Sequence, residues 1–166
     1  MANIIFIHGL ESSGSGFKAR ILKKQIPEIM TPDFEPYNSE ISIDLILKKR
    51  MKQLESVLNK NTLWIIIGSS FGGLMGTIYA LQKPKNVYKL ILLAPFLIET
   101  YFNNIKVKPL NIPVIIFHGK NDNVVNHNKT KWIAQKCFNN LQYHLVNDDH
   151  FLHSTVQSLN WKELIL

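Results

Sequence analysis

The segment that most constrains the fold of this chain is residues 63–73, where an apolar, β-branched run leads directly into Gly-Ser-Ser-Phe-Gly. Residues 64–67 are too few for a helix of their own and are typical of a buried strand in a parallel sheet. Residues 74–81 follow a helical pattern that ends before Pro84. A strand therefore turns sharply into a helix at a G-x-S-x-G sequence, with Ser70 at its centre.

A turn of this kind suits a nucleophilic serine. We expect its backbone to be strained and crowded, so that a Cβ at Gly68 or Gly72 would collide with neighbouring chain while Ser70 is pushed outward. The helix that starts behind Ser70 offers free N–H groups and a positive dipole end, both of which favour an oxyanion. The alternative interpretation is an ordinary strand-to-helix turn, because Gly and Ser are common in turns.

Strand-like and helix-like patterns alternate along the chain. Short apolar runs predict strands at residues 3–7, 64–67, 88–93, 114–117 and 142–146, with a further short edge strand at 29–32. Helices are predicted at 17–26, 43–58, 74–81, 128–138 and 154–166, and Ser42 is the expected N-cap of the second. Residues 95–112 form the longest irregular segment, with room for a short helix. The alternation predicts an α/β fold, a three-layer, doubly wound sandwich around a parallel sheet, and 166 residues suffice for one domain, 1–166, with its own core.

The composition argues against several classes of protein. The net charge is +7, but the 17 lysines and 2 arginines are scattered and no aromatic residues interleave with a basic stripe, so we expect no nucleic-acid partner. Cys137 is the only cysteine, which excludes an intramolecular disulfide and suits a reducing compartment. No leader-like segment is visible, and the longest apolar stretch, residues 90–98, is too short to span a bilayer. We therefore expect a cytoplasmic protein without membrane insertion.

A serine hydroxyl becomes a strong nucleophile only beside a base, and the base needs an acid to orient it. In an open α/β sheet these groups must meet at the carboxyl ends of strands. Asp122 follows the strand at 114–117 and is the preferred acid, with Glu99 as the second choice. His150 follows the last strand and is the preferred base, and His153, close to the closing helix, is its rival.

The oxyanion of an acyl-transfer reaction needs two backbone N–H groups. Phe71, directly after the nucleophile, offers one, and the loop at residues 8–13 offers the other, most simply from Leu10. His8 is the residue expected to orient that loop.

Two other kinds of site fit the sequence poorly. The glycine-rich loop lacks the Gly-Lys-[Ser/Thr] ending of a phosphate-binding loop, because Gly16-Phe17-Lys18 stands there. The spacing of His144, His150 and His153 matches no compact metal-ligand motif. We therefore expect neither a cofactor nor a metal ion.

These motifs together make the chain resemble the α/β-hydrolase superfamily, and among its members the small, cap-less bacterial esterases. The matching residues, in chain order, are His8-Gly9 with its serine-rich loop, Gly68-Ser69-Ser70-Phe71-Gly72-Gly73, the His-Gly-x-x-Asp that ends at Asp122, and Asp149-His150. The resemblance implies a minimal fold of about six parallel strands, because the first two strands of the full fold are missing. No lid domain fits in residues 95–112. The candidates for an apolar wall beside the nucleophile are residues of this segment, namely Phe96, Leu97, Tyr101 and Phe102, with packing in the core as the alternative for each of them.

Three functions are compatible with such a chain. The preferred one is a serine hydrolase that cleaves a small-molecule ester or thioester of a small to medium acyl group through Ser70, His150 and Asp122. The others are an acyltransferase with the same triad and a hydrolase-fold binding protein without turnover. The intact set of triad candidates favours an enzyme, while the acyl group, the alcohol and the oligomeric state stay open.

Overall fold

Five parallel strands form the centre of the molecule. The computed structural model describes residues 2–58, 62–102 and 108–166. The strands are β1 (Asn3–Ile7), β2 (Trp64–Ser69), β3 (Val87–Leu93), β4 (Val114–Gly119) and β5 (Leu141–Val146), and they lie side by side in chain order. Parallel neighbours need a crossover between them, and helices supply most of these crossovers. All five carboxyl ends consequently meet at one edge of the sheet.

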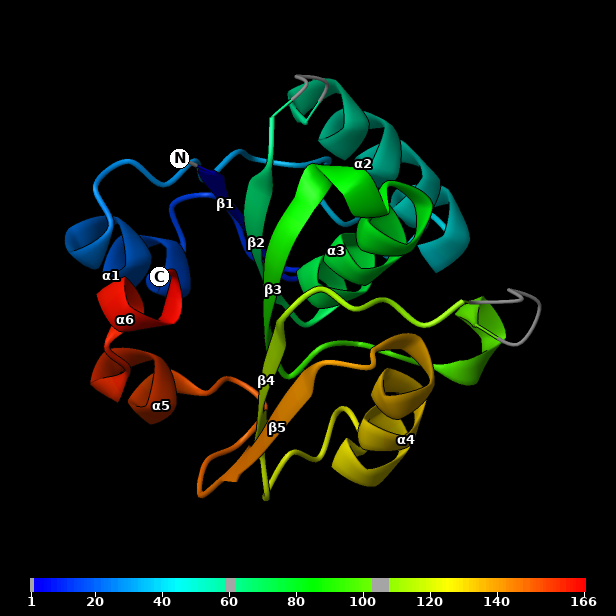
Figure 1. Ribbon diagram of the computed structural model, residues 1–166. Helices are drawn as coiled ribbons and strands as arrows, with labels where there is room; N and C mark the ends of the chain where they lie inside the picture. Colours follow the sequence, from blue (N-terminus) through cyan, green and yellow to red (C-terminus); the bar gives the residue numbers. More distant parts are fainter. Residues whose placement is uncertain (1, 59–61, 103–107) are drawn as a thin grey trace.

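The helices cover both faces of this sheet. Figure 1 shows α1 (Phe17–Gln25), α5 (His153–Ser158) and α6 (Trp161–Leu164) on one face, and α2 (Ile43–Val57), α3 (Phe71–Gln82) and α4 (His127–Cys137) on the other. Short 3-10 turns occur at Pro84–Asn86 and Glu99–Tyr101. The predicted α/β class and the three-layer, doubly wound arrangement are thus confirmed.

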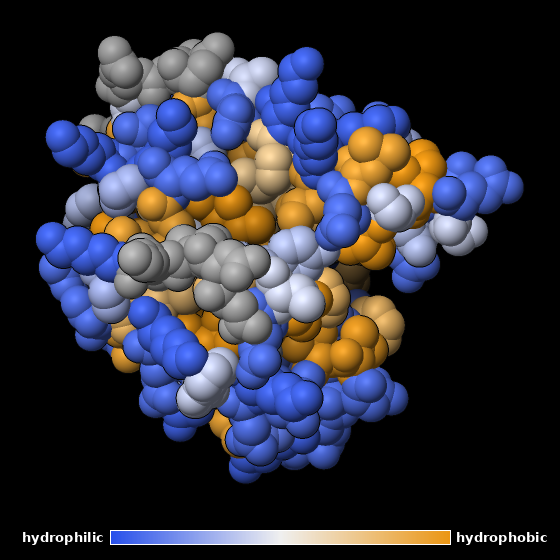
Figure 2. All heavy atoms as spheres, turned by 90° about the vertical axis from the view of Figure 1, so that its right-hand side faces the viewer, coloured by the Kyte–Doolittle hydropathy of each residue, from blue (hydrophilic) through white to orange (hydrophobic). Residues whose placement is uncertain are grey.

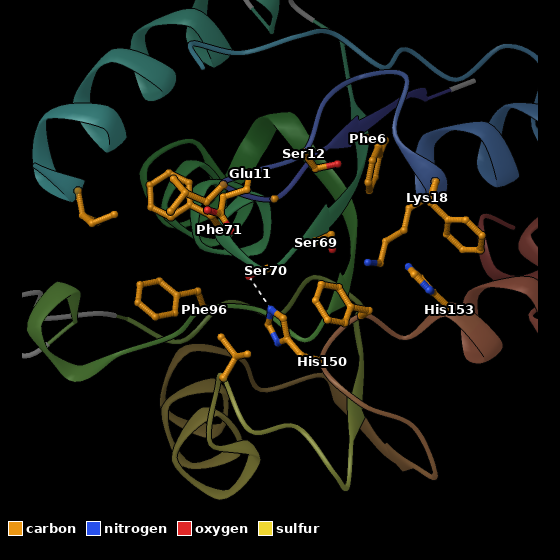
Figure 3. Close-up of a pocket in the computed structure, with 16 residues that line it drawn as sticks. Phe6, Glu11, Ser12, Lys18, Ser69, Ser70, Phe71, Phe96, His150 and His153 are labelled. Carbon is orange, nitrogen blue, oxygen red and sulfur yellow. Dashed lines mark hydrogen bonds between the residues drawn. The ribbon is translucent and has the colours of Figure 1, made fainter. Parts of the chain in front are cut away.

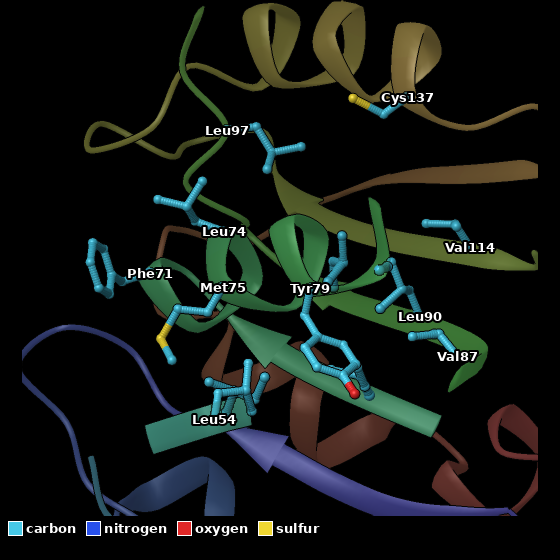
Figure 4. Close-up of a cluster of buried hydrophobic side chains, with 14 of the residues drawn as sticks. Leu54, Phe71, Leu74, Met75, Tyr79, Val87, Leu90, Leu97, Val114 and Cys137 are labelled. Atoms are coloured by element: carbon cyan, nitrogen blue, oxygen red, sulfur yellow. The ribbon is translucent and has the colours of Figure 1, made fainter. Parts of the chain in front are cut away.

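The alternation of side chains along each strand divides the core in two. Ile5 and Ile66 pack beneath α2, α3 and α4, whereas Ile4 and Ile65 pack beneath α1, α5 and α6. Figure 4 shows part of the first cluster, which also buries Cys137. Because β2 lies between β1 and β3 and is covered on both faces, every one of its residues is buried, as is typical of a central strand in a parallel sheet.

Two predicted elements differ from those in the structure. At residues 29–32 only Met30 pairs with β1, in an isolated parallel bridge in which the Phe6 and Met30 amides donate hydrogen bonds of 2.8 and 2.9 Å. In the described part of the chain the sheet therefore has five strands, close to the expected number of about six. The closing helix is not continuous over 154–166, because Leu159 is extended and Asn160 precedes the separate helix α6.

The surface is predominantly polar over the helices. Figure 2 views the face formed by α2 and α4, where hydrophilic side chains gather over α4 and apolar side chains show between the helices. Across residues 2–58, 62–102 and 108–166, none of the helices combines the length and the apolar composition that crossing a membrane requires.

Candidate active site

The backbone of Ser70 is held in an unusual conformation. Ser70 has φ 51° and ψ −113°, and the other non-glycine residues with positive φ in the described part of the chain are Ala94 and Leu152. An L-residue with a side chain rarely adopts positive φ, and doing so costs about 1–3 kcal/mol. Ser70 directly follows β2, Ala94 directly follows β3, and Leu152 lies in the segment after β5, so the strain is concentrated where these strands end.

The surrounding chain is packed tightly enough to maintain this conformation. A Cβ on Gly68 would lie 2.6 Å from the Gly72 carbonyl oxygen, and one on Gly72 would collide with the carbonyl oxygens of Ile7 and His8. The Ser70 amide donates to the Leu93 carbonyl over 2.9 Å. The crowding expected at the two glycines is therefore present, although the positive φ lies at the serine.

Three side chains from different loops meet beside this turn. The Nε2 of His150 lies 3.1 Å from the Ser70 Oγ, and its Nδ1 lies 2.8 Å from the Asp122 Oδ2. Ser70 follows β2, Asp122 follows β4 and His150 follows β5. The carboxyl ends of β2, β4 and β5, which lie at one edge of the sheet, thus bring together residues that are 80 and 28 positions apart in the chain. Figure 3 shows the contact between His150 and Ser70.

The Asp122 carboxylate is fully buried and held by several donors. Its Oδ1 accepts hydrogen bonds from the amides of Val124 and Val125, at 2.9 and 2.8 Å. Burial raises the pKa of Asp122, but the hydrogen bonds from Val125, His150 and Val124 outweigh burial and leave the pKa below its ordinary value. The carboxylate is therefore ionised at neutral pH and can orient an imidazole.

A second histidine contacts the same carboxylate, which the sequence analysis did not assign to the site. The Nε2 of His118 lies 3.0 Å from the Asp122 Oδ2 and 3.1 Å from the Val125 carbonyl oxygen. Both partners are acceptors, so Nε2 carries the proton. The Nδ1 atom lies 2.9 Å from the Tyr143 hydroxyl. Burial lowers the pKa of His118, which favours this neutral tautomer despite the adjacent carboxylate.

Two buried residues fix the loop that follows β1. The Nε2 of His8 accepts from the Phe34 amide over 3.1 Å, so its Nδ1 donates to the Gly9 carbonyl over 2.8 Å. Burial lowers the pKa of His8, which keeps it neutral in this role. The Arg50 guanidinium donates to the carbonyl oxygens of Gly9 and Leu10, at 3.3 and 2.7 Å. Both carbonyls are thereby held by Arg50, and the Leu10 N–H has no acceptor among the described residues.

Arg50 was also missed, although its spacing contains a signal. It lies four residues after Ile46 and four before Leu54, on the stripe of α2 that faces the core. A fully buried arginine at such a position must have acceptors, and here they are loop carbonyls.

A cavity of about 460 Å³ opens over Ser70. It is lined by residues from the loop after β1, the start of α1, the start of α2, the Ser70 turn and the segments after β3, β4 and β5. They include the predicted residues Leu10, Ser70, Phe71, Phe96 and His150. Figure 3 shows Phe96 and Phe71 on one side of His150, with Lys18 and His153 on the other.

The structure places three of the four expected wall residues away from this cavity. Leu97 is buried in the core beneath α3 and α4 (Figure 4), and Phe102 packs against the same core. The Tyr101 hydroxyl donates to Asp44 over 2.8 Å. The physical reason is that the consecutive residues Phe96 and Leu97 have their side chains in different places, one in the cavity lining and one in the core, and that the chain then turns at Glu99–Tyr101 before it reaches Phe102. Residues 103–107 of this segment lie outside the described part of the chain.

The two rival residues do not contact the triad. Glu99 is exposed at the start of a 3-10 turn, and its carboxylate has no hydrogen bond to a described residue. His153 lines the cavity, but its ring packs against that of Phe17 in a tilted arrangement, at a centroid distance of 4.2 Å and an interplanar angle of 41°. Within the described ranges, no three His, Cys, Asp or Glu side chains are grouped so that they could hold a metal ion.

Comparison with known proteins identifies the family of this chain. Residues 36–155, well over half of the chain, match the Alpha/beta hydrolase family. A comparison with curated protein sequences gave no match. Similar solved structures include mouse alpha/beta hydrolase domain-containing protein 10, at 19% identity and a TM-score of 0.78 over 98% of this chain and 88% of the other.

Two bacterial structures are similar over comparable lengths. A protein of the alpha/beta superfamily of hydrolases from Xanthomonas campestris is 22% identical, with a TM-score of 0.76 over 99% of this chain and 98% of its own. The carboxylesterase of Bacillus cereus is 16% identical, with a TM-score of 0.73 over 99% and 89%. These identities support the fold, and the family match gives the classification: the chain belongs to the alpha/beta hydrolase family.

Proposed function

We propose that this hydrolase cleaves a carboxylic ester or thioester of a small to medium acyl group through a serine-bound acyl intermediate. The observation that carries the proposal is the continuous contact from Ser70 Oγ through His150 to the buried Asp122 carboxylate, at 3.1 and 2.8 Å. This order of groups is the one that activates a serine for attack on a carbonyl carbon. The carboxylesterase name of a structurally similar Bacillus cereus protein is consistent with it.

The reaction has two balanced halves. The Ser70 Oγ attacks the carbonyl carbon while His150 Nε2 takes the hydroxyl proton, and Asp122 holds the imidazolium that forms. The oxyanion of the tetrahedral intermediate faces the N–H groups of Leu10 and Phe71. The intermediate collapses to the acyl-serine as His150 returns the proton to the departing alcohol or thiol. Water, deprotonated by His150, then attacks the acyl group, and His150 returns that proton to the Ser70 Oγ as the acid is released.

Labelling by a fluorophosphonate, which reacts with activated serines, tests this proposal. The wild-type protein is expected to be labelled at Ser70 and to hydrolyse p-nitrophenyl butyrate, and Ser70→Ala is expected to do neither. Product analysis with added alcohols separates the acyltransferase, because a transferase yields a new ester in place of the free acid. A folded wild-type protein that is neither labelled nor active would contradict the proposal and favour a binding protein.

A further inference from the structure

Lys18 is the one cationic side chain among those that line the cavity over Ser70 and are not histidines. It projects from the first turn of α1, and Figure 3 shows its nitrogen turned into the cavity on the side of His153. The proposed triad does not use it.

No protein group neutralises this ammonium directly. Within the described ranges Lys18 has neither a hydrogen bond nor an ion pair, and the carboxylates that influence it most are Asp148 and Asp149. Asp148 accepts hydrogen bonds from the amide and the hydroxyl of Thr155, and Asp149 accepts one from the Phe151 amide. Both carboxylates are therefore committed to shaping the segment that carries His150.

The position of Lys18 brings no evident benefit to folding. Burial lowers the pKa of Lys18 to about 8, an effect that Asp149 and Asp148 oppose. Lys18 also lies in the first turn of α1, where the helix dipole disfavours a cation and no acidic residue offsets it. A desolvated cation that has no ion-pair partner and lies beside the proposed nucleophile is better explained by an anionic ligand that pairs with it.

We propose that Lys18 forms an anion subsite, and that the substrate is an ester that carries a carboxylate within reach of its ammonium. This inference rests on the proposed function and specifies its substrate class. The cavity then has two sides. Phe96 and Phe71 line the apolar side, on which Glu11 also lies, and Lys18 and His153 line the basic side, with Ser70 between them. An ester with one apolar group and one anionic group matches this division.

Matched pairs of methyl esters test the subsite. Monomethyl glutarate and methyl pentanoate differ in a carboxylate that replaces the terminal methyl group, and methanol release measures kcat/KM for both. The monomethyl esters of malonate, succinate and adipate place the carboxylate at other distances from the ester group, and thus show at which distance Lys18 binds it. Acetate esters of glycolate and 3-hydroxypropanoate, each compared with its neutral alkyl acetate, place the anion on the alcohol side instead.

The readout is the ratio of kcat/KM for the anionic ester to that for its neutral partner. Lys18→Met is expected to lower this ratio about 10- to 100-fold, the effect of losing one charge-assisted hydrogen bond. Lys18→Arg is expected to retain it within about threefold of wild type, because it keeps the charge. Lys23→Met, on the exposed side of the same helix, is the matched control and should not change it. The melting temperature of Lys18→Met is expected to stay the same or to rise.

The pH dependence gives a second readout. The ammonium loses its proton as pH rises through about 8, so the wild-type ratio is expected to fall between pH 7 and 9. Glu11, Asp148, Asp149 and His153 are the other charged or titratable groups around Lys18. Their effects persist in Lys18→Met, so a fall that is present in the wild type and absent from this variant belongs to Lys18.

The two proposals can fail separately. The subsite proposal is wrong if the wild type hydrolyses neutral esters through Ser70 but prefers no ester with a carboxylate, at any chain length, on the acyl or the alcohol side. It is also wrong if Lys18→Met leaves the ratio of kcat/KM values unchanged. If the wild type hydrolyses neither ester of any pair, the proposed esterase function is wrong, and the subsite proposal fails with it.

Discussion

The reaction centre and the cavity wall of this hydrolase are built in different ways. We use reaction centre for the proposed triad of Ser70, His150 and Asp122, and cavity wall for the side chains around them, among them Phe96 and Lys18. The polar side chains of the reaction centre are joined to one another or to backbone amides by hydrogen bonds of 2.8–3.1 Å. Phe96 and Lys18 are half-buried, and their side chains make no hydrogen bond to a described residue.

This difference separates chemistry from specificity. A fixed reaction centre is already arranged for the transition state, so changes there should reduce kcat strongly. Residues of the cavity wall that make no side-chain hydrogen bonds can be substituted without disturbing the triad. Substitutions there should therefore alter which substrate is preferred. The predictions below test this separation.

The largest effect is expected at the nucleophile. Ser70→Ala removes the attacking oxygen and should lower kcat for p-nitrophenyl butyrate by about 10⁴-fold or more, with an unchanged circular dichroism spectrum. Ser69→Ala is the control, because Ser69 is the last residue of β2 and does not contact His150. Loss of activity in Ser69→Ala but not in Ser70→Ala would reverse the assignment.

The other two members of the reaction centre should act as a unit. His150→Ala and Asp122→Asn are each expected to lower kcat by about 10³- to 10⁴-fold, because each leaves the serine proton without an oriented base. His153→Ala and Glu99→Gln serve as matched controls and should retain most of the rate, since neither residue contacts the triad. The assignment would be contradicted if His153→Ala lowered kcat more than His150→Ala, or if Glu99→Gln lowered it more than Asp122→Asn, in steady-state kinetics.

Substitution of His118 should have an effect of intermediate size, and the effect should be on kcat and not on KM. His118→Phe removes one donor to the Asp122 carboxylate and should lower kcat about 10-fold with little change in KM. His118→Gln retains an N–H donor and should restore part of the loss. Because the Val125 carbonyl also loses its hydrogen bond from His118, the free energy of unfolding of His118→Phe should fall by about 1–3 kcal/mol. A change in KM alone would indicate that His118 does not act through Asp122.

The smallest effect is expected at the apolar wall. Phe96→Ala should lower the preference for p-nitrophenyl butyrate over the acetate about threefold to tenfold, because each buried methylene contributes about 0.8 kcal/mol. Tyr101→Phe is the control, since Tyr101 comes from the same segment but bonds to Asp44. Equal changes in selectivity for both variants would show that the segment acts as a whole.

Much of the fold was predictable because its signals are local. The β-branched run before Ser70, the capping Ser42 and the apolar spacing of α2 each specify an element within a few residues. The arrangement of Ser70, Asp122 and His150 followed from one general rule, that parallel strands end at the same edge. The Ser42 side chain indeed accepts the Leu45 amide over 3.2 Å.

The features that were missed depend on contacts between distant segments. The contact of His118 with Asp122 depends on how the loop after β4 folds back, and position 118 alone does not reveal it. Lys18 reaches the cavity only because α1 packs against the segment that follows β5. The edge strand at 29–32 was overestimated because a short apolar run does not show how many of its residues find a partner.

The strained backbone at Ser70 makes enzymatic activity a measure of the integrity of the central sheet. Its positive φ persists while the end of β1 crowds Gly72 and the end of β3 accepts the Ser70 amide. A partially unfolded form in which either strand has separated from β2 allows Ser70 to relax to an ordinary φ, and the hydroxyl then moves away from His150. Local openings of this kind need less free energy than global unfolding, so gentle heating should abolish turnover while much of the helical signal is still present.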